Sequence, residues 1–290
     1  MKNPRPIQPS TRVDPRSGDW IPSSFEGFAS ELDAVTRAIA ESGSLPLFRG
    51  HRRREWRLDS TFARSVKAVL FDIKPEEGYP PRLAQSGDLN AALSSLLLLK
   101  FGTVIEPSAA LMAVEVEHGV DSWFELMKRY QQYPKEDPTP VLKGTNFLDW
   151  SQSSDVALYF ANEDRDGPGA LFICDATATG KTLQRLPVVE ILRKIREQLM
   201  RGVSNGAPLM FSPPRQIVNP RAKNQQAIYF AQMELRVDLR ELWQLVENTP
   251  GRETVLVKLV LPEGTEDEVG TYLLSKGVDR SFIYPDAPPQ

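Results

Sequence analysis

The order in which strand-like and helix-like runs follow one another constrains the fold of this chain more than any other feature. Apolar runs of strand length stand at residues 45–48, 169–176 and 253–262, and amphipathic runs of helix length stand at 23–43 and 265–278. The two kinds of run are mixed, but they do not alternate strictly as they do in a parallel doubly wound sheet. The sequence therefore predicts an α+β fold with mixed sheets and flanking helices.

The clearest helix of the sequence lies at 23–43, where apolar residues recur at helical spacing. Ser23 and Glu26 form a capping-box pattern at its start, and Gly43 is a natural stop. Two further helical patterns lie at 121–133 and 187–202.

The first part of the chain lacks the pattern of a folded segment. Residues 1–22 contain five prolines and no apolar periodicity, which predicts a flexible, proline-rich arm that is dispensable for folding. Beyond this arm we expect one domain over residues 23–290, since 41% hydrophobic residues supply a sizeable core.

Composition excludes several classes of protein. The formal net charge of -3 argues against a protein that coats nucleic acid non-specifically. One cysteine, Cys174, excludes an internal disulfide, and two histidines, His51 and His118, argue against a metal site. Since there is neither an apolar run of membrane-spanning length nor a secretory signal pattern, we expect no membrane association and a cytoplasmic location.

Positive side chains are concentrated in the stretch LPLFRGHRRREW, residues 45–56. Arg49 follows an apolar strand and precedes Gly50, which permits a turn or the close approach of a ligand. The guanidinium fork suits a phosphate or carboxylate, but Arg49 could equally pair a buried acid such as Asp149. His51 and residues 52–54 fit a solvated turn, or a positive rim that attracts a polyanion.

The stretch GTNFLDWSQSSDVALYFA, residues 144–161, is a second concentration of polar and aromatic residues. Asp149 or Ser151 could cap the helix that follows, with Trp150 in the core. Alternatively, Thr145, Asp149 and Trp150 form the wall of a pocket, and the helix N-terminus offers amides to an anion. We favour the pocket, because capping alone does not require a tryptophan there.

The stretch NPRAKNQQAIYF, residues 219–230, is the third. Gln225 and Gln226 precede a strand, and adjacent residues of an extended backbone point in opposite directions, so at most one of the two faces a given site. A polar loop without a binding role is the alternative. Elsewhere the sequence has none of the phosphate-loop, dinucleotide-binding, zinc-protease or serine-hydrolase motifs.

Taken together, these three stretches resemble the FRG domain family, which is named after a Phe-Arg-Gly signature. The signature stands here at residues 48–50 and is followed by Trp56, Leu58 and Arg64 in the family's order. The second and third stretches are similar to the family's Leu-Asp-Trp segment with its Ala-Leu-Tyr-Phe-Ala helix and to its later Gln-Gln segment. With a similar carboxyl-terminal pattern, the resemblance covers residues 25–288.

The chain departs from the family pattern at several positions. The family's Gln-His segment before the Leu-Asp-Trp motif is absent here, together with its histidine. Asn146 replaces an arginine, and Ala227 replaces the glycine after the two glutamines.

The order of the motifs also resembles that of ADP-ribosyltransferases, which implies a split-sheet cleft that binds NAD. By this resemblance Arg49 holds the NAD pyrophosphate, and Thr145 with Asp149 or Ser151 orients the nicotinamide ribose. Gln226 stands where such enzymes have a carboxylate. A glutamine cannot replace that carboxylate, so either Asp149 supplies the negative charge or the site binds without reacting. The NAD-binding residues implied are Arg49, Gly50, His51, Thr145, Trp150 and Ser151.

The leading hypothesis is therefore an FRG-domain protein that binds NAD or a related nucleotide and transfers ADP-ribose or hydrolyses NAD, in a bacterial or phage defence or toxin setting. Its acceptor would be a protein or a nucleic acid. The alternative is a non-catalytic module that senses a nucleotide or a nucleic-acid end, and a phosphodiesterase is the least favoured. Under the leading hypothesis Arg49, Asp149 and Gln226 converge on one pocket.

Overall fold

A computed structural model describes residues 7–102, 141–176, 209–211, 220–247 and 255–285. The helical patterns at 121–133 and 187–202, and His118, lie outside these residues. The described part has an eight-stranded mixed sheet in the order β1-β2-β8-β5-β3-β4-β7-β6. The strands are β1 (Arg12–Val13), β2 (Trp20–Ile21), β3 (Pro46–His51), β4 (Phe147–Ser151), β5 (Gly169–Asp175), β6 (Leu209–Phe211), β7 (Ala227–Ala231) and β8 (Leu256–Leu261).

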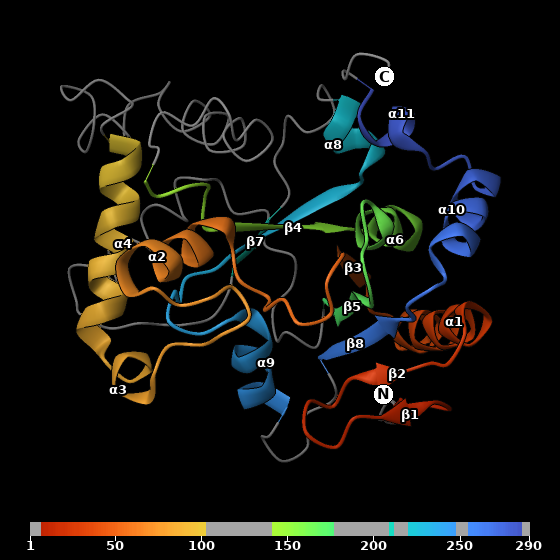
Figure 1. Cartoon of the computed structure of the whole chain (residues 1–290), viewed down its shortest axis with the longest axis horizontal. Coiled ribbons are helices and arrows are strands. Elements are labelled where there is room, and N and C mark those ends of the chain that lie inside the picture. Colours follow the sequence, from red (N-terminus) through yellow and green to blue (C-terminus); the bar gives the residue numbers. More distant parts are fainter. Residues whose placement is uncertain (1–6, 103–140, 177–208, 212–219, 248–254, 286–290) are drawn as a thin grey trace.

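Helices flank this sheet in two groups (Figure 1). β2 runs parallel to β8, and the other neighbouring strands are antiparallel. The mixed sheet with its helices confirms the α+β prediction. The helices are α1 (Phe25–Glu41), α2 (Thr61–Phe71), α3 (Pro81–Ala84), α4 (Gly87–Gly102), α6 (Ser154–Asn162), α8 (Pro220–Asn224), α9 (Leu239–Glu247), α10 (Glu266–Ser275) and α11 (Arg280–Ile283).

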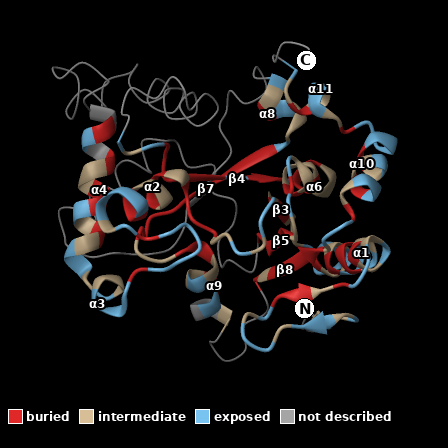
Figure 2. Cartoon of the chain, in the orientation of Figure 1, coloured by how far each residue is buried: buried red, intermediate tan, exposed pale blue. Residues whose placement is uncertain are grey.

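The core is divided by the two faces of the sheet. Neighbouring residues of a strand point to opposite faces. In β3, Phe48 packs in the cluster that also holds side chains of α1, α6 and α10, whereas Leu47 packs in a second cluster with Trp243 of α9. A third cluster joins α2 and α4 to β4 and β7. Strands β5, β7 and β8 are buried almost throughout, whereas β3 is only partly buried (Figure 2).

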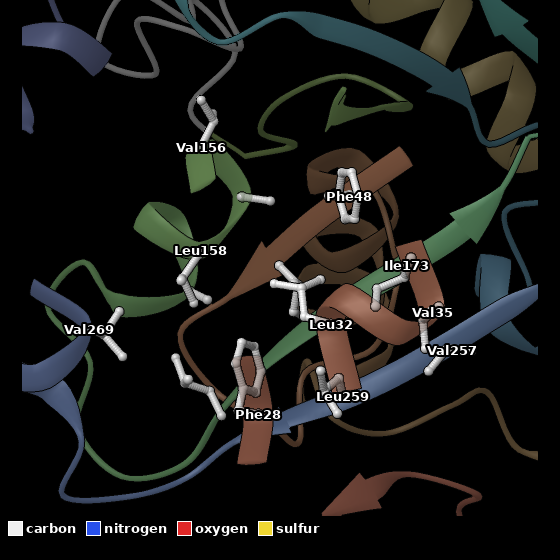
Figure 3. Packing of buried hydrophobic residues seen from close by; sticks show 14 of the residues in the cluster. Phe28, Leu32, Val35, Phe48, Val156, Leu158, Ile173, Val257, Leu259 and Val269 are labelled. Atoms are coloured by element: carbon white, nitrogen blue, oxygen red, sulfur yellow. The ribbon is translucent and has the colours of Figure 1, made fainter. Parts of the chain in front are cut away.

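Helix α1 confirms the helix that was predicted at 23–43, although its N-cap is Ser24, whose side chain accepts from the Gly27 amide, and not Ser23. The helix turns one apolar stripe toward the sheet. In Figure 3, Phe28, Leu32 and Val35 lie over side chains of β3, β5 and β8. This stripe closes the side of the sheet that also receives α6.

The prediction of a flexible arm over residues 1–22 is wrong for the part that the structure describes. β1 and β2 form a hairpin, and β2 pairs with β8 at Trp20 and Leu259. Trp20 and Asp19 are both buried. Proline content indicated disorder, but a buried tryptophan and a buried acid dock this segment on the sheet edge.

Candidate functional site

In the middle of the sheet, β3 and β4 pair only briefly. β3 pairs with β5 along its whole length, but the register of β3 with β4 has one position, Phe48 opposite Ser151. Beyond this position the two strands no longer pair, so the edge of each strand faces the other across a gap. β3 also extends to His51, so Arg49 lies inside the strand and not at its end, as the sequence suggested.

A cavity of about 270 Å³ occupies this split in the sheet. Consecutive residues of β3 and of β4 line this cavity. Since consecutive strand residues point to opposite faces of the sheet, the cavity meets both sets at the edges of the strands. The volume is close to the lower limit, about 300 Å³, of ordinary ligand pockets. Its lining is Phe48, Arg49, Gly50, His51, Arg52, Trp56, Arg64, Asp149, Trp150, Ser151, Val156, Ala157, Phe160, Glu163, Gln225 and Ala227.

Arg49 bridges the split. Its Nε donates to His51 Nε2 over 3.1 Å, and its Nη1 donates to the backbone carbonyl of Asp149. Burial lowers the pKa of the Arg49 guanidinium to about 10; the Asp149 carboxylate opposes this shift and the charge of Arg64 adds to it. Arg49 therefore stays positive at neutral pH. Asp149 is exposed, so it is not the buried acid that the sequence suggested as a partner of Arg49, although its charge acts on the guanidinium.

His51 is a buried, neutral hydrogen-bond acceptor. Burial, followed by the charges of Arg49, Arg64 and Lys258, holds the pKa of its imidazole well below the ordinary value, while the backbone of Trp56 acts in the opposite direction. A neutral ring can accept the Arg49 hydrogen bond through Nε2, which a charged ring cannot. His51 therefore orients Arg49 and adds no charge to the rim, contrary to the predicted positive rim.

The low pKa of His51 makes the fold acid-sensitive. The unfolded imidazole binds a proton below about pH 6.5, but the folded imidazole binds it only at lower pH, so stability falls as the pH drops below 6.5. Between pH 6.5 and 5.5 we expect the free energy of unfolding of wild type to fall by about 1 kcal/mol more than that of His51→Gln. Urea denaturation of both proteins at the two pH values measures this, and parallel pH profiles would contradict the assignment.

Only one of the three arginines at 52–54 lines the cavity. The Arg52 guanidinium lies 5.5 Å from the centre of the Trp56 ring and 3.8 Å from Asp164. Arg53 is exposed beside Glu55, and Arg54 pairs with Asp14 and Asp19 on the docked N-terminal segment. The three arginines therefore have different roles: Arg52 lines the cavity, Arg53 lies on the surface, and Arg54 holds the N-terminal segment.

Arg64 of α2 is a pocket residue to which sequence reasoning assigned no role. Its Nη1 donates to the Asp59 carbonyl over 2.6 Å and its Nη2 to Thr61 Oγ1 over 3.2 Å. Burial lowers the pKa of Arg64, and the Asp59 charge opposes this. Its place in the Trp-Leu-Arg run of the family resemblance was the one signal in the sequence. Arg49, Arg52 and Arg64 together make the cavity suited to an anion.

Helix α6 forms one side of the cavity because Gly50 lets it approach β3 closely. A Cβ at Gly50 would lie 1.9 Å from the Ala157 carbonyl oxygen. Gly50 therefore serves helix packing in the first place, rather than the approach of a ligand. The N-cap of α6 is Ser153, which accepts from the Val156 amide over 3.3 Å, so neither Asp149 nor Ser151 caps the helix.

Trp150 and Ser151 line the cavity while also holding the fold. Trp150 is 2% exposed and packs edge-to-face on Phe230 and Trp243. Ser151 Oγ donates to the Gln225 carbonyl over 2.8 Å and accepts from the Ser153 amide over 2.9 Å. The core and pocket interpretations of Trp150 are therefore both correct.

Thr145 and Gln226, two of the expected site residues, do not line the cavity. Thr145 is fully buried, and its Oγ1 accepts from the Phe147 amide over 3.1 Å, which shapes the entry to β4. Gln226 is exposed and has a left-handed backbone, with φ of 45°, which turns it away. Arg49 and Asp149 do line one cavity, as predicted, but the third residue of the lining is Gln225 and not Gln226.

Gln225 and Glu163 complete the polar lining. Gln225 Nε2 donates to the Ile283 carbonyl over 3.2 Å, which ties the cavity to α11. Glu163 follows α6 and lies on the same helical face as Val156 and Phe160, since residues three, four and seven apart share a face. That spacing was the signal by which the sequence could have revealed Glu163.

Other chemistry is not evident in the described residues. They contain no group of three histidine, cysteine or acidic side chains that could hold a metal ion. Cys174 is fully buried, and burial raises the pKa of its thiol well above the ordinary value, so it is a poor nucleophile. In the same part of the chain, every helix is too short or too polar to cross a membrane.

Comparison with known proteins does not assign the chain to a family. No family model matches it, and neither a curated protein nor a solved structure is significantly similar to it.

Proposed function

We propose that this chain is an FRG-domain protein that binds a nucleotide, with NAD as the leading ligand, in the split between β3 and β4. The observation that supports this most is Arg49, which spans the split beside Arg52 and Arg64 in a cavity with aromatic walls. Guanidinium forks match phosphate oxygens, and aromatic faces accept a base or a nicotinamide ring. Trp56 and Phe160 supply such faces.

ADP-ribosyl transfer or NAD hydrolysis is the activity that this ligand suggests. The bond between C1′ of the ribose and the nicotinamide nitrogen breaks, and nicotinamide leaves with the electron pair. A protein or nucleic-acid acceptor, or water, then bonds to C1′ and releases a proton. Asp149 is the acid beside Arg49 that would stabilise the positive sugar, whereas Gln226, outside the cavity, has no part in this step.

A non-catalytic nucleotide sensor is the second candidate. Gln225, which lines the cavity just before β7, favours this candidate. Its amide cannot stabilise a positive sugar as a carboxylate does. Incubation of the purified protein with NAD, with and without cell lysate, separates the two candidates. Release of nicotinamide supports the enzyme, binding without release supports the sensor, and no binding contradicts both.

Arg49→Ala is expected to weaken NAD binding about 100-fold, because removal of a charged hydrogen-bonding group costs about 3 kcal/mol. Titration calorimetry measures the loss. The matched control is Arg53→Ala, which removes an exposed arginine four residues away and should leave NAD affinity unchanged. If Arg49→Ala instead unfolds the protein, the arginine is structural and the proposal loses its main support.

A further inference from the structure

Glu163 brings a carboxylate into the same cavity as the arginines. The cavity is lined by one face of α6 and by the residue that follows the helix, namely Val156, Ala157, Phe160 and Glu163. At about 1.5 Å per residue, Glu163 stands about 10 Å along the α6 axis from Val156. The cavity therefore offers a ligand both cationic groups, from β3 and α2, and an acid at the far end of α6.

The Glu163 carboxylate is held in place by two phenols. Tyr159 donates to Oε1 over 3.2 Å, and Tyr284, which follows α11, donates to Oε2 over 3.0 Å. Burial, together with the charge of Glu163, raises the pKa of Tyr159 to about 12, so this donor keeps its proton at neutral pH. The Tyr284 ring also packs against the guanidinium groups of Arg221 and Arg280, which lie 5.0 and 5.4 Å from its centre.

This arrangement leaves the carboxylate able to accept more hydrogen bonds. Each oxygen of a carboxylate has two acceptor positions. Oε1 receives Tyr159 and lies 3.7 Å from Arg280 Nη1, and Oε2 receives Tyr284. The side chain is 23% exposed, so it is not sealed in the core. The geometry therefore suits a ligand that presents two neighbouring hydroxyl groups.

A purely structural role, as a tether for the carboxyl-terminal segment, explains Glu163 less well. Asn224 Nδ2 already donates to the Phe282 carbonyl over 2.8 Å, and Gln225 Nε2 donates to the Ile283 carbonyl. Ile283 is also fully buried. Arg280 of α11 also lies 3.7 Å from Glu163 Oε1, but this pair is partly exposed and contributes little. The other contacts hold α11 in place without a glutamate that faces the cavity.

We infer that Glu163 binds the 2- and 3-hydroxyl groups of a ribose whose phosphate lies on Arg49 and Arg64. Acidic side chains commonly recognise ribose hydroxyls in this way. This inference rests on the proposed nucleotide binding and narrows the ligand to a ribonucleotide. Tyr159 and Tyr284 are then positioning residues, which act on the ligand through the Glu163 carboxylate.

The test compares ribose 5-phosphate with 2-deoxyribose 5-phosphate by titration calorimetry on the full chain, with NAD as a third ligand. Wild type should bind the ribose compound about 10-fold more tightly, because a hydrogen bond to a charged group is lost with the deoxy compound. Glu163→Ala should reduce this preference to less than about 2-fold, and Tyr284→Phe should reduce it in part. Glu268→Ala, which removes an exposed glutamate of α10, is the control and should keep the full preference.

Each outcome decides between the inference and the function on which it rests. Equal affinity of wild type for the two pentose phosphates would overturn the ribose assignment. This comparison needs no variant. Retention of the preference by Glu163→Ala would also overturn it. In both cases Arg49-dependent NAD binding would leave the nucleotide proposal standing, whereas failure of all three ligands to bind would overturn both.

Discussion

Gly50→Ala is expected to lower the free energy of unfolding by more than about 4 kcal/mol or to prevent folding, the largest single effect that the structure indicates. The added Cβ would stand 1.9 Å from the Ala157 carbonyl oxygen and 2.6 Å from the Ala161 amide nitrogen. Both are backbone atoms of α6, so no side-chain rotation can relieve the overlap. The helix would have to move away from β3.

That movement would also dismantle the cavity, since Val156, Phe160 and Glu163 reach it only while α6 is seated on β3. Urea denaturation measures the stability loss, and NAD titration of any folded fraction measures the loss of the site. Gly270→Ala is the matched control. Gly270 lies in α10, and an added Cβ would meet no atom within 4 Å beyond its own helix backbone and chain neighbours, so alanine should be neutral or stabilise by up to about 1 kcal/mol. A Gly50→Ala protein as stable as wild type would show that α6 does not need this close approach.

Patterns within one element could be predicted from the sequence. The stripe of Phe28, Leu32 and Val35 marks α1 because a helix repeats every 3.6 residues, and the apolar runs at β5 and β8 mark buried strands. Arg49 was singled out because it follows an apolar run and precedes a glycine, and Asp149 because it stands with a tryptophan just before a helix. Their convergence follows from the order of the motifs.

Features that depend on contacts between elements could not be predicted. Whether Gln225 or Gln226 faces the cavity is decided by the left-handed turn at Gln226, and propensity does not indicate such a turn for glutamine. Gly50 was assigned to a turn or to the approach of a ligand, because nothing in its neighbourhood indicates that a helix about 110 residues later packs on it. Glu163 was not singled out, because its place in the cavity depends on how α6 packs on β3.

The docked N-terminal segment leads to the second large effect. Asp19→Ala is expected to destabilise the protein by about 3 to 5 kcal/mol, because the side chain is 2% exposed and compensates three cations. Its carboxylate lies 2.7 Å from Arg240 Nη1, 3.1 Å from Arg54 Nε and 3.4 Å from Lys258 Nζ. Burial opposes ionisation, but Lys258, Arg240 and Arg54 outweigh it and lower the pKa of Asp19. Without the acid, three positive groups would repel one another at the edge of the sheet.

Urea denaturation measures this loss, and limited proteolysis should at the same time begin to cut the segment that contains β1 and β2. Asp14→Ala is the matched control, because Asp14 also pairs with Arg54 and accepts from the Arg16 and Ser17 amides, but its side chain is 27% exposed. Its removal should destabilise the protein much less than Asp19→Ala. If Asp19→Ala is as stable as wild type, the N-terminal segment is the flexible arm that its prolines predicted. If the expected loss is found while NAD affinity persists in the folded protein, Arg54 belongs to the scaffold, and the positive charge that a ligand meets comes from Arg49, Arg52 and Arg64.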